Sequence, residues 1–367
     1  MNGTNPPQPR ARSLGLPFKG KPGAFNAITD VAGVEVGTKT LISGDGALVV
    51  GEGPIRTGVT AILPRGRTNS HIPCAAGYYS LNGNGEMTGL VWIEESGELQ
   101  TPITITNTHS CGVTRDATIR WMVGNKIGIG QDWGLPVAAE TYDGDLNDIN
   151  GFHVTAEHTM AALDAARGGP VEMGSVGGGT GMICYDFKAG NGSSSRLVSI
   201  DGVDYTVGVF VQANFGAREQ MTILGVPVGQ HLTANKLRGK DQGSVIAIVA
   251  TDAPLQPHQL KRLARRVPMG LARTGTVGNN SSGDIFLAFS TANAQAYDGS
   301  AAKLRTASFL RNNAIDLIFN AVVEATEEAV IDSMVCNQTM VGRDGNTSVA
   351  LPIEQMMALM EKYNRLA

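Results

Sequence analysis

Short apolar runs rich in β-branched residues alternate along this chain with longer amphipathic stretches. Strands bounded by Gly or Pro are predicted at residues 33–37, 58–63, 90–93, 103–106, 196–200, 205–213, 244–251 and 285–290. Helices are predicted at residues 111–122, 151–167, 257–267, 312–331 and 352–363. Residues 1–24, rich in Pro and Arg, predict an extended arm. Strands and helices alternate without a strict βαβ rhythm, which indicates one layered α/β (α+β) domain over residues 1–367.

Composition narrows the class of protein. The 367 residues are 42% hydrophobic and 17% charged, which is ample for a packed core and unlike a disordered chain. The net charge is −4 and no long Lys/Arg run is present, so binding to nucleic acid or to anionic membranes is disfavoured. Four scattered cysteines form no C-x-x-C pair, and the polar N-terminus lacks the apolar segment of a signal peptide. We expect a soluble cytoplasmic protein.

Neither the glycine-rich segment nor the histidines of this chain indicate a phosphate or metal site. Residues 174–181 (GSVGGGTG) are glycine-dense but lack the Gly-Lys-Ser/Thr ending of a phosphate loop, and a strand-like run follows them. A tight loop near an active site or at a subunit contact explains them better. The six histidines do not pair at metal-ligand spacing, so structural roles are favoured and no metal or cofactor is expected.

The junction of Gly243 and Ser244 places a serine at the first position of a buried strand. A polar run at 236–243 precedes it and the apolar run 244–251 follows. If the peptide bond before Ser244 were cut, one residue would carry a hydroxyl nucleophile and an α-amine base. That pair can hydrolyse amides or esters without histidine or metal. An ordinary loop-to-strand junction explains the local pattern equally well, so both interpretations stay open at this point.

The wider chain favours the first interpretation. Six motifs occur in a fixed order: DVAGVEVG (30–37), NGEMTG (84–89), ETYDG (140–144), VQANFG (211–216), GS (243–244) followed by ATDAPL (250–255), and SGDIF (282–286). Together they resemble the L-aminopeptidase/D-esterase–amidase family, which includes the β-peptidyl aminopeptidases. The resemblance runs from about residue 15 to the C-terminus. Each segment is weak alone, but the ordered set is specific.

The resemblance implies a fold and a processing step. Family members form four αββα layers similar to those of N-terminal-nucleophile hydrolases, with different connectivity. They are made as inactive precursors that cut themselves before the nucleophilic serine. Here this implies cleavage between Gly243 and Ser244, leaving an α chain (1–243) and a β chain (244–367). Relatives assemble as tetramers of αβ units, so the resemblance also implies a homo-oligomer.

It also implies a role for each matching residue. Ser244 corresponds to the nucleophile, and Ser282 and Asp284 to the pair that holds its amine. Side chains two apart on a strand point the same way, which suits that pairing. Some members carry glutamate where this chain has Asp284.

Three further positions match substrate-facing residues of the family. Asn214 corresponds to the oxyanion-hole asparagine, although a turn asparagine explains it locally. Glu140 corresponds to the carboxylate that holds the substrate's free ammonium group, which explains aminopeptidase rather than endopeptidase action. Tyr142 corresponds to a residue beside the reacting centre that either donates to the oxyanion or shapes the pocket.

The predicted function is therefore removal of small N-terminal residues from peptides, amides or esters. Specificity for α- or β-amino acids, and for L- or D-residues, stays open. One alternative is an acyl transferase like ornithine acetyltransferase, but that enzyme uses threonine as its nucleophile. The other is an uncleaved, non-catalytic family member. A denaturing gel separates the hydrolase (two chains) from the non-catalytic protein (one chain).

Overall fold

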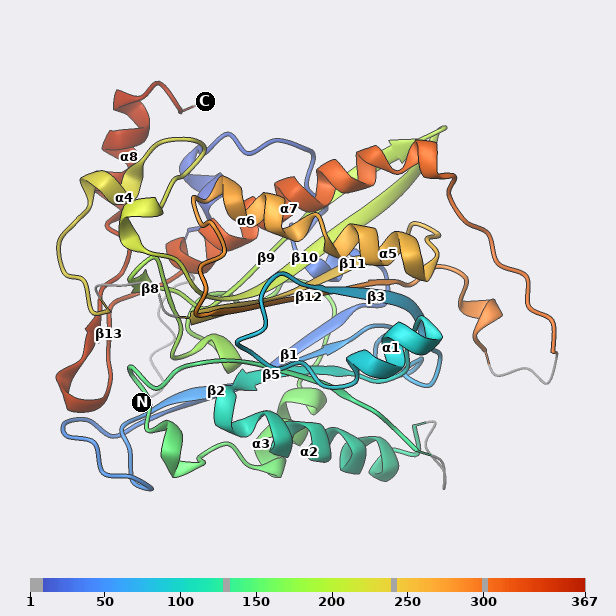
Figure 1. Cartoon of the computed structure of the whole chain (residues 1–367), viewed down its shortest axis with the longest axis horizontal. Coiled ribbons are helices and arrows are strands. Elements are labelled where there is room, and N and C mark those ends of the chain that lie inside the picture. Colours follow the sequence, from blue (N-terminus) through green and yellow to red (C-terminus); the bar gives the residue numbers. More distant parts are fainter. Residues whose placement is uncertain (1–8, 128–132, 239–242, 299–302, 367) are drawn as a thin grey trace.

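Four layers of secondary structure make up the computed structural model, which describes residues 9–127, 133–238, 243–298 and 303–366. Helices cover the outer faces of two stacked sheets (Figure 1). The larger sheet has the order β4 (Glu98–Leu99), β3 (Cys74–Ser80), β12 (Ser282–Ser290), β11 (Gly243–Thr251), β10 (Val203–Asn214) and β9 (Asn191–Ile200). The smaller has the order β1 (Glu35–Ser43), β2 (Ile55–Leu63), β5 (Ile103–Asn107) and β6 (Val137–Thr141). This is the αββα arrangement implied by the resemblance.

The helices lie in two groups. Helices α5 (Pro257–Ala264), α6 (Val267–Arg273) and α7 (Asp316–Val335) cover the larger sheet, and α2 (Cys111–Gly124) and α3 (Ala156–Asp164) cover the smaller one. The remaining elements are α1 (Leu90–Ser96), α4 (Val228–His231), α8 (Ile353–Lys362) and the short strands β7 (Ile183–Cys184), β8 (Phe187–Lys188), β13 (Met340–Val341) and β14 (Thr347–Ser348). The predicted helices are found, with their ends shifted by several residues.

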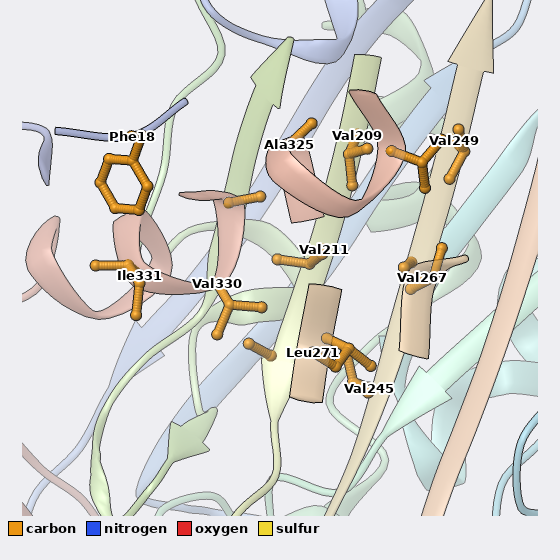
Figure 2. Close-up of a cluster of buried hydrophobic side chains, with 14 of the residues drawn as sticks. Phe18, Val209, Val211, Val245, Val249, Val267, Leu271, Ala325, Val330 and Ile331 are labelled. Atoms are coloured by element: carbon orange, nitrogen blue, oxygen red, sulfur yellow. The ribbon is translucent and has the colours of Figure 1, made fainter. Parts of the chain in front are cut away.

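Strand β11 is apolar on both faces because each face packs against another layer. Val245 and Val249 lie with Leu271 of α6 and Val330 of α7 in the outer core (Figure 2). The alternate residues, including Ile246, lie in the core between the two sheets. Successive strand residues point to opposite faces, so a strand buried on both sides reads as a continuous apolar run. This is why the sequence predicts a strand at residues 244–251.

The run at residues 90–93, predicted as a strand, is instead the start of helix α1. Of this run only Ile93 is buried, and Val91 is exposed. Gly89 and Gly97, both in left-handed conformation, bracket the helix. A short apolar run cannot be assigned to a strand or a helix by periodicity alone, which is the reason for the error.

The prediction of an extended arm is wrong for residues 9–24; residues 1–8 lie outside the described chain. This segment packs on α7, and its Leu16 and Phe18 are buried in the outer core. Arg10 contacts Asp332 at 2.6 Å, and a second arginine of the segment makes a similar ion pair with α7. Apolar anchors among the prolines fix the segment in place.

Helix α7 approaches β9 so closely that only glycine fits at position 192. A Cβ added to Gly192 would lie 1.9 Å from the carbonyl oxygen of Ala329. We expect Gly192→Ala to lower the melting temperature by several degrees, because the helix must move away from the sheet. Gly112→Ala is the control: an added Cβ there meets no atom within 4 Å, and alanine has the higher helix propensity. Equal melting temperatures for the two variants, measured by differential scanning fluorimetry, would contradict this packing.

Candidate active site

A cavity of about 510 Å³ opens between the two sheets, at the end where β6 contacts β11. Its lining comes from the segments that follow β3 and β5, from the end of β6 and the residue after it, from the start of β11 and from the residue before β12. The lining residues are Asn84, Gly85, Glu86, Thr108, Glu140, Tyr142, Gly243, Ser244 and Ser281. The cavity therefore brings together four residues selected from the sequence: Glu140, Tyr142, Gly243 and Ser244.

Strand register places Asn214 beside Ser244. The two residues are direct partners in the antiparallel pairing of β10 and β11. Directly paired residues share one face of a sheet. The next pair, Ala213 and Val245, faces the outer core, so Asn214 and Ser244 face the space between the sheets. The side chain that could stabilise an oxyanion thus lies on the same face as the proposed nucleophile.

Gly243 is held in a conformation and a space that admit only glycine. Its φ is 153°, which residues with a side chain rarely adopt. A Cβ at this position would lie 1.6 Å from the carbonyl oxygen of Asn214. Residues 239–242 of the preceding polar run lie outside the described chain. The pairing of β10 with β11 therefore explains why glycine precedes Ser244.

Ser282 and Asp284 lie behind the cavity rather than in its lining. Both are buried, and the Ser282 hydroxyl donates to Asp284 Oδ1 at 2.5 Å, so the two side chains point the same way. In the parallel pairing of β11 with β12, Gly243 aligns with Ser282 and Ser244 with Gly283. The Ser282–Asp284 pair therefore borders the backbone of residues 243–245, on the face opposite the Ser244 side chain. This location suits a contact with the Ser244 nitrogen.

The hydrogen bonds of Asn214 define the orientation of its amide. Its Oδ1 accepts from the backbone N–H of Ile183 at 3.0 Å and from the Arg238 guanidinium at 2.9 Å. Its Nδ2 donates to the carbonyl of Tyr142 at 2.8 Å. An amide nitrogen carries two hydrogens, so Nδ2 can make one further donation, to a group bound beside its strand partner Ser244.

Glu140 is a buried carboxylate with two internal donors. Its Oε1 accepts from the backbone N–H of Glu86 at 2.9 Å, and its Oε2 accepts from the hydroxyl of Thr108. Burial raises the pKa of Glu140, and the hydrogen bond from Thr108 lowers it. The charged residues of the cavity lining, Glu86 and Glu140, are both acidic. The lining thus favours a cationic group on a bound molecule.

The side chain of Tyr142 is partly exposed at the cavity, and its ring lies against Gly144. Burial, and next the negative charge of Asp145, raise the pKa of its phenol. The hydroxyl is therefore protonated at neutral pH and available as a donor. The backbone carbonyl of Tyr142, by accepting from Asn214, takes part in the site as well.

Sequence reasoning missed Thr108, Arg238 and the Asn84–Glu86 segment as site residues. Thr108 directly follows β5, and Tyr142 directly follows β6. The ends of parallel strands meet at one sheet edge, so the pairing of β5 with β6 would have identified Thr108. The segment at 84–86 stands out in the sequence only as part of a family pattern, and no local pattern marks Arg238.

The glycine-rich segment at 174–181 packs between the two sheets rather than forming an open loop. Its Gly178 lies against Ile105 and Gln212, where an added Cβ would be 2.3 Å from Gln212 Oε1. Gln212 in turn donates to Thr141 at 2.7 Å. The segment therefore supports strand β6, which contains Glu140 and ends directly before Tyr142, and this agrees with a position near the active site.

Within the described residues, no group of three or more His, Cys, Asp or Glu side chains has an arrangement that could hold a metal ion. A helix both long and apolar enough to span a membrane is also not found there.

Comparison with known proteins identifies the family. The sequence pattern of Peptidase family S58 matches residues 26–348. The chain belongs to peptidase family S58. Beta-peptidyl aminopeptidase BapA of Sphingosinicella microcystinivorans is 52% identical over 98% of this chain and 93% of its own length.

Two solved structures match nearly the whole chain. The L-aminopeptidase D-Ala-esterase/amidase of Ochrobactrum anthropi, described as a variant of the N-terminal-nucleophile hydrolase fold, superposes with a TM-score of 0.93 at 47% identity, covering 98% of this chain and all of that one. A Burkholderia sp. beta-aminopeptidase gives 0.89 at 45% identity, covering 96% and 99%. The chain is thus an aminopeptidase of the serine N-terminal-nucleophile type.

Asp143 follows Tyr142 in the chain, and its burial should make the stability of the protein depend on pH. It is fully buried, accepts from Asn147 at 3.0 Å, and burial raises its pKa to about 7. A carboxyl whose pKa is raised on folding binds its proton more tightly in the native state. The free energy of unfolding that it contributes is therefore greatest below about pH 4 and falls as the pH rises to about 7.

Asp143→Asn removes this titration. We expect the melting temperature of the variant, relative to the wild type, to rise steadily between about pH 4 and 7 and then level off. Asp201→Asn, at an exposed turn, is the matched control and should show no such trend. A constant difference for Asp143→Asn across this range would show that Asp143 does not titrate there.

Proposed function

We propose that the chain cuts itself between Gly243 and Ser244, and that the new N-terminal serine is the nucleophile of an aminopeptidase. The observation that carries this proposal is that Gly243 and Ser244 line the cavity and that Asn214 is the partner of Ser244 on the neighbouring strand. The products are an α chain of residues 1–243 and a β chain of residues 244–367. Family S58 membership supports the same scheme.

Self-cleavage proceeds through an ester. The Ser244 hydroxyl attacks the Gly243 carbonyl; a C–O bond forms, the C–N bond breaks, and the α-amine of Ser244 is released. Water then hydrolyses the ester, which leaves a carboxylate on Gly243 and restores the hydroxyl. Gly243 suits this step because it has no side chain to shield its carbonyl.

Turnover uses the amine that self-cleavage releases. An α-amine has a pKa of about 8, close to the pH at which a general base is most effective. It takes the proton from the Ser244 hydroxyl as the hydroxyl attacks the substrate carbonyl, and it gives the proton to the leaving group as the scissile bond breaks. Water then hydrolyses the acyl ester on Ser244, and the Ser282–Asp284 pair holds the amine in place throughout. The second N–H of the Asn214 amide donates to the oxyanion, an interaction typically worth about 3 kcal/mol. Tyr142 supplies a further donor or closes that side of the pocket.

Glu140 selects substrates with a free N-terminal amine. A buried carboxylate next to the nucleophile pairs with the substrate ammonium, which places the first residue of the peptide in the cavity. We propose that N-terminal β-amino acid residues are substrates, since the relative at 52% identity is named a beta-peptidyl aminopeptidase. Hydrolysis assays on the p-nitroanilides of β-homoalanine, L-alanine and D-alanine test this choice.

Assembly into a homo-oligomer is part of the proposal. Phe309 and Leu317, exposed by 56% and 50%, both border a second surface cavity. Exposed apolar side chains gathered in this way are typical of subunit contacts. Light scattering on the purified protein measures the number of subunits.

Ser244→Ala removes the proposed nucleophile of self-cleavage. We expect this variant to remain a single chain on a denaturing gel, whereas the wild type gives two chains and the smaller one begins at Ser244 by N-terminal sequencing. Ser43→Ala, the same change at an exposed position of β1, should be cleaved like the wild type. Cleavage of Ser244→Ala would disprove the scheme, and an uncleaved wild type would favour the non-catalytic alternative.

Glu140→Gln tests the ammonium site. Loss of a charge-assisted hydrogen bond of about 2–3 kcal/mol should raise KM by at least about 30-fold. In the wild type, KM should rise as the pH falls through the raised pKa of Glu140, because the protonated carboxyl no longer attracts the ammonium group. This rise should be absent in Glu140→Gln. Glu157→Gln, at the exposed start of α3, is the control; an unchanged KM in Glu140→Gln would reject the assignment.

A further inference from the structure

Arg238 lies six residues before Ser244, yet its side chain is directed into the protein. Its exposed fraction is only 5%. The guanidinium donates to Asn214 Oδ1 at 2.9 Å, to Asp145 Oδ2 at 2.7 Å and to the carbonyl of Ile183 at 3.2 Å. Arg238 therefore joins the segment that leads to the proposed cleavage site with the residue proposed to stabilise the oxyanion.

The position of Arg238 is defined by its surroundings rather than by Asn214. Its backbone N–H and that of Leu237 both donate to Asp186 Oδ1, at 3.0 and 2.9 Å. Asp145 adds a charged acceptor for the side chain. With main chain and side chain both held, the direction of the donor to Asn214 is set before any substrate binds.

This donor decides which end of the Asn214 amide is directed toward Tyr142, a residue of the cavity lining. Two N–H groups, from Ile183 and Arg238, point at Oδ1. Rotating the amide by 180° would bring its own hydrogens against both of them and its oxygen against the carbonyl of Tyr142. The flipped state would lose three hydrogen bonds inside the protein, where unpaired donors are costly. Arg238 thereby keeps the amide nitrogen on the side of the reacting centre.

Arg238 also changes the strength of that nitrogen as a donor. A cationic donor on a carbonyl oxygen polarises the amide, and hydrogen bonds linked through one polar group strengthen one another. The site is buried, so solvent screens this effect little.

We propose that Arg238 is a positioning residue that orients and polarises the Asn214 amide for oxyanion stabilisation, both in self-cleavage and in turnover. The inference rests on the proposed role of Asn214. Residue 238 would stay on the α chain after the cut. The segment that precedes the cleavage site would therefore take part in turnover as well as in self-cleavage.

The test compares Arg238→Gln and Arg238→Lys with Arg56→Gln. Arg56 is a matched control: its side chain is 6% exposed, and it donates to Asp45 at 2.9 Å and to backbone carbonyls such as that of Val341. For Arg238→Gln we expect self-cleavage at least about 10-fold slower, and in the cleaved enzyme a kcat at least about 10-fold lower with KM within threefold. Arg238→Lys should recover part of the rate. Arg56→Gln should lower the melting temperature but leave both rates near the wild type.

A double-mutant cycle with Asn214→Ala identifies the path of the effect. If Arg238 acts through Asn214, Arg238→Gln should slow self-cleavage in the wild-type background but add little in the Asn214→Ala background. Equal effects in both backgrounds, or an Arg238→Gln variant with wild-type rates, would overturn the inference alone. Wild-type rates for Asn214→Ala would overturn the proposed oxyanion role, and the inference with it. The self-cleavage rate is read from gels over days, so variants that process slowly still give a result.

Discussion

The pairing of β11 between β10 and β12 is the interaction on which the site depends. The antiparallel partner sets Asn214 opposite Ser244, and the parallel partner sets the Ser282–Asp284 pair beside the Ser244 backbone. A shift of one residue in either pairing would turn these side chains to the wrong face of the sheet. The close approach of Gly243 to the Asn214 carbonyl fits this register. The same pairing therefore requires glycine at position 243 and places Asn214 beside Ser244.

The same strands explain how a cut chain would remain one folded unit. The two central strands of the larger sheet, β11 and β12, come after the proposed cleavage site, and their neighbours β3 and β10 come before it. Helix α7 also comes after the cleavage site and packs on β9 and β10. Its Asp332 and Glu328 form ion pairs with Arg10 and Arg196, which come before the cleavage site. Backbone hydrogen bonds and apolar packing on both faces would therefore hold the two chains together.

Acidic and basic side chains occupy different parts of the site. Acidic groups line the cavity, where a substrate ammonium would sit, and the cation Arg238 lies behind Asn214, where a developing oxyanion would be stabilised. Each buried charge has polar partners: Glu140 accepts two hydrogen bonds, and Arg238 is paired with Asp145. Such pairing is what keeps ionised groups tolerable away from water.

The sequence by itself determined the elements that have a strong local signal. The doubly buried strand at 244–251, the helices and the Ser282–Asp284 spacing follow from periodicity and side-chain alternation, and the ordered motifs selected Glu140, Tyr142 and Asn214. The prediction of a strand at 90–93 is wrong, because the short apolar pattern suits a strand or a helix equally and the segment is helical. Only the tertiary structure decided the roles of Thr108, Gly178 and Arg238, which lie far along the chain from the groups they contact. Their contacts depend on strand order and register, which no local pattern contains.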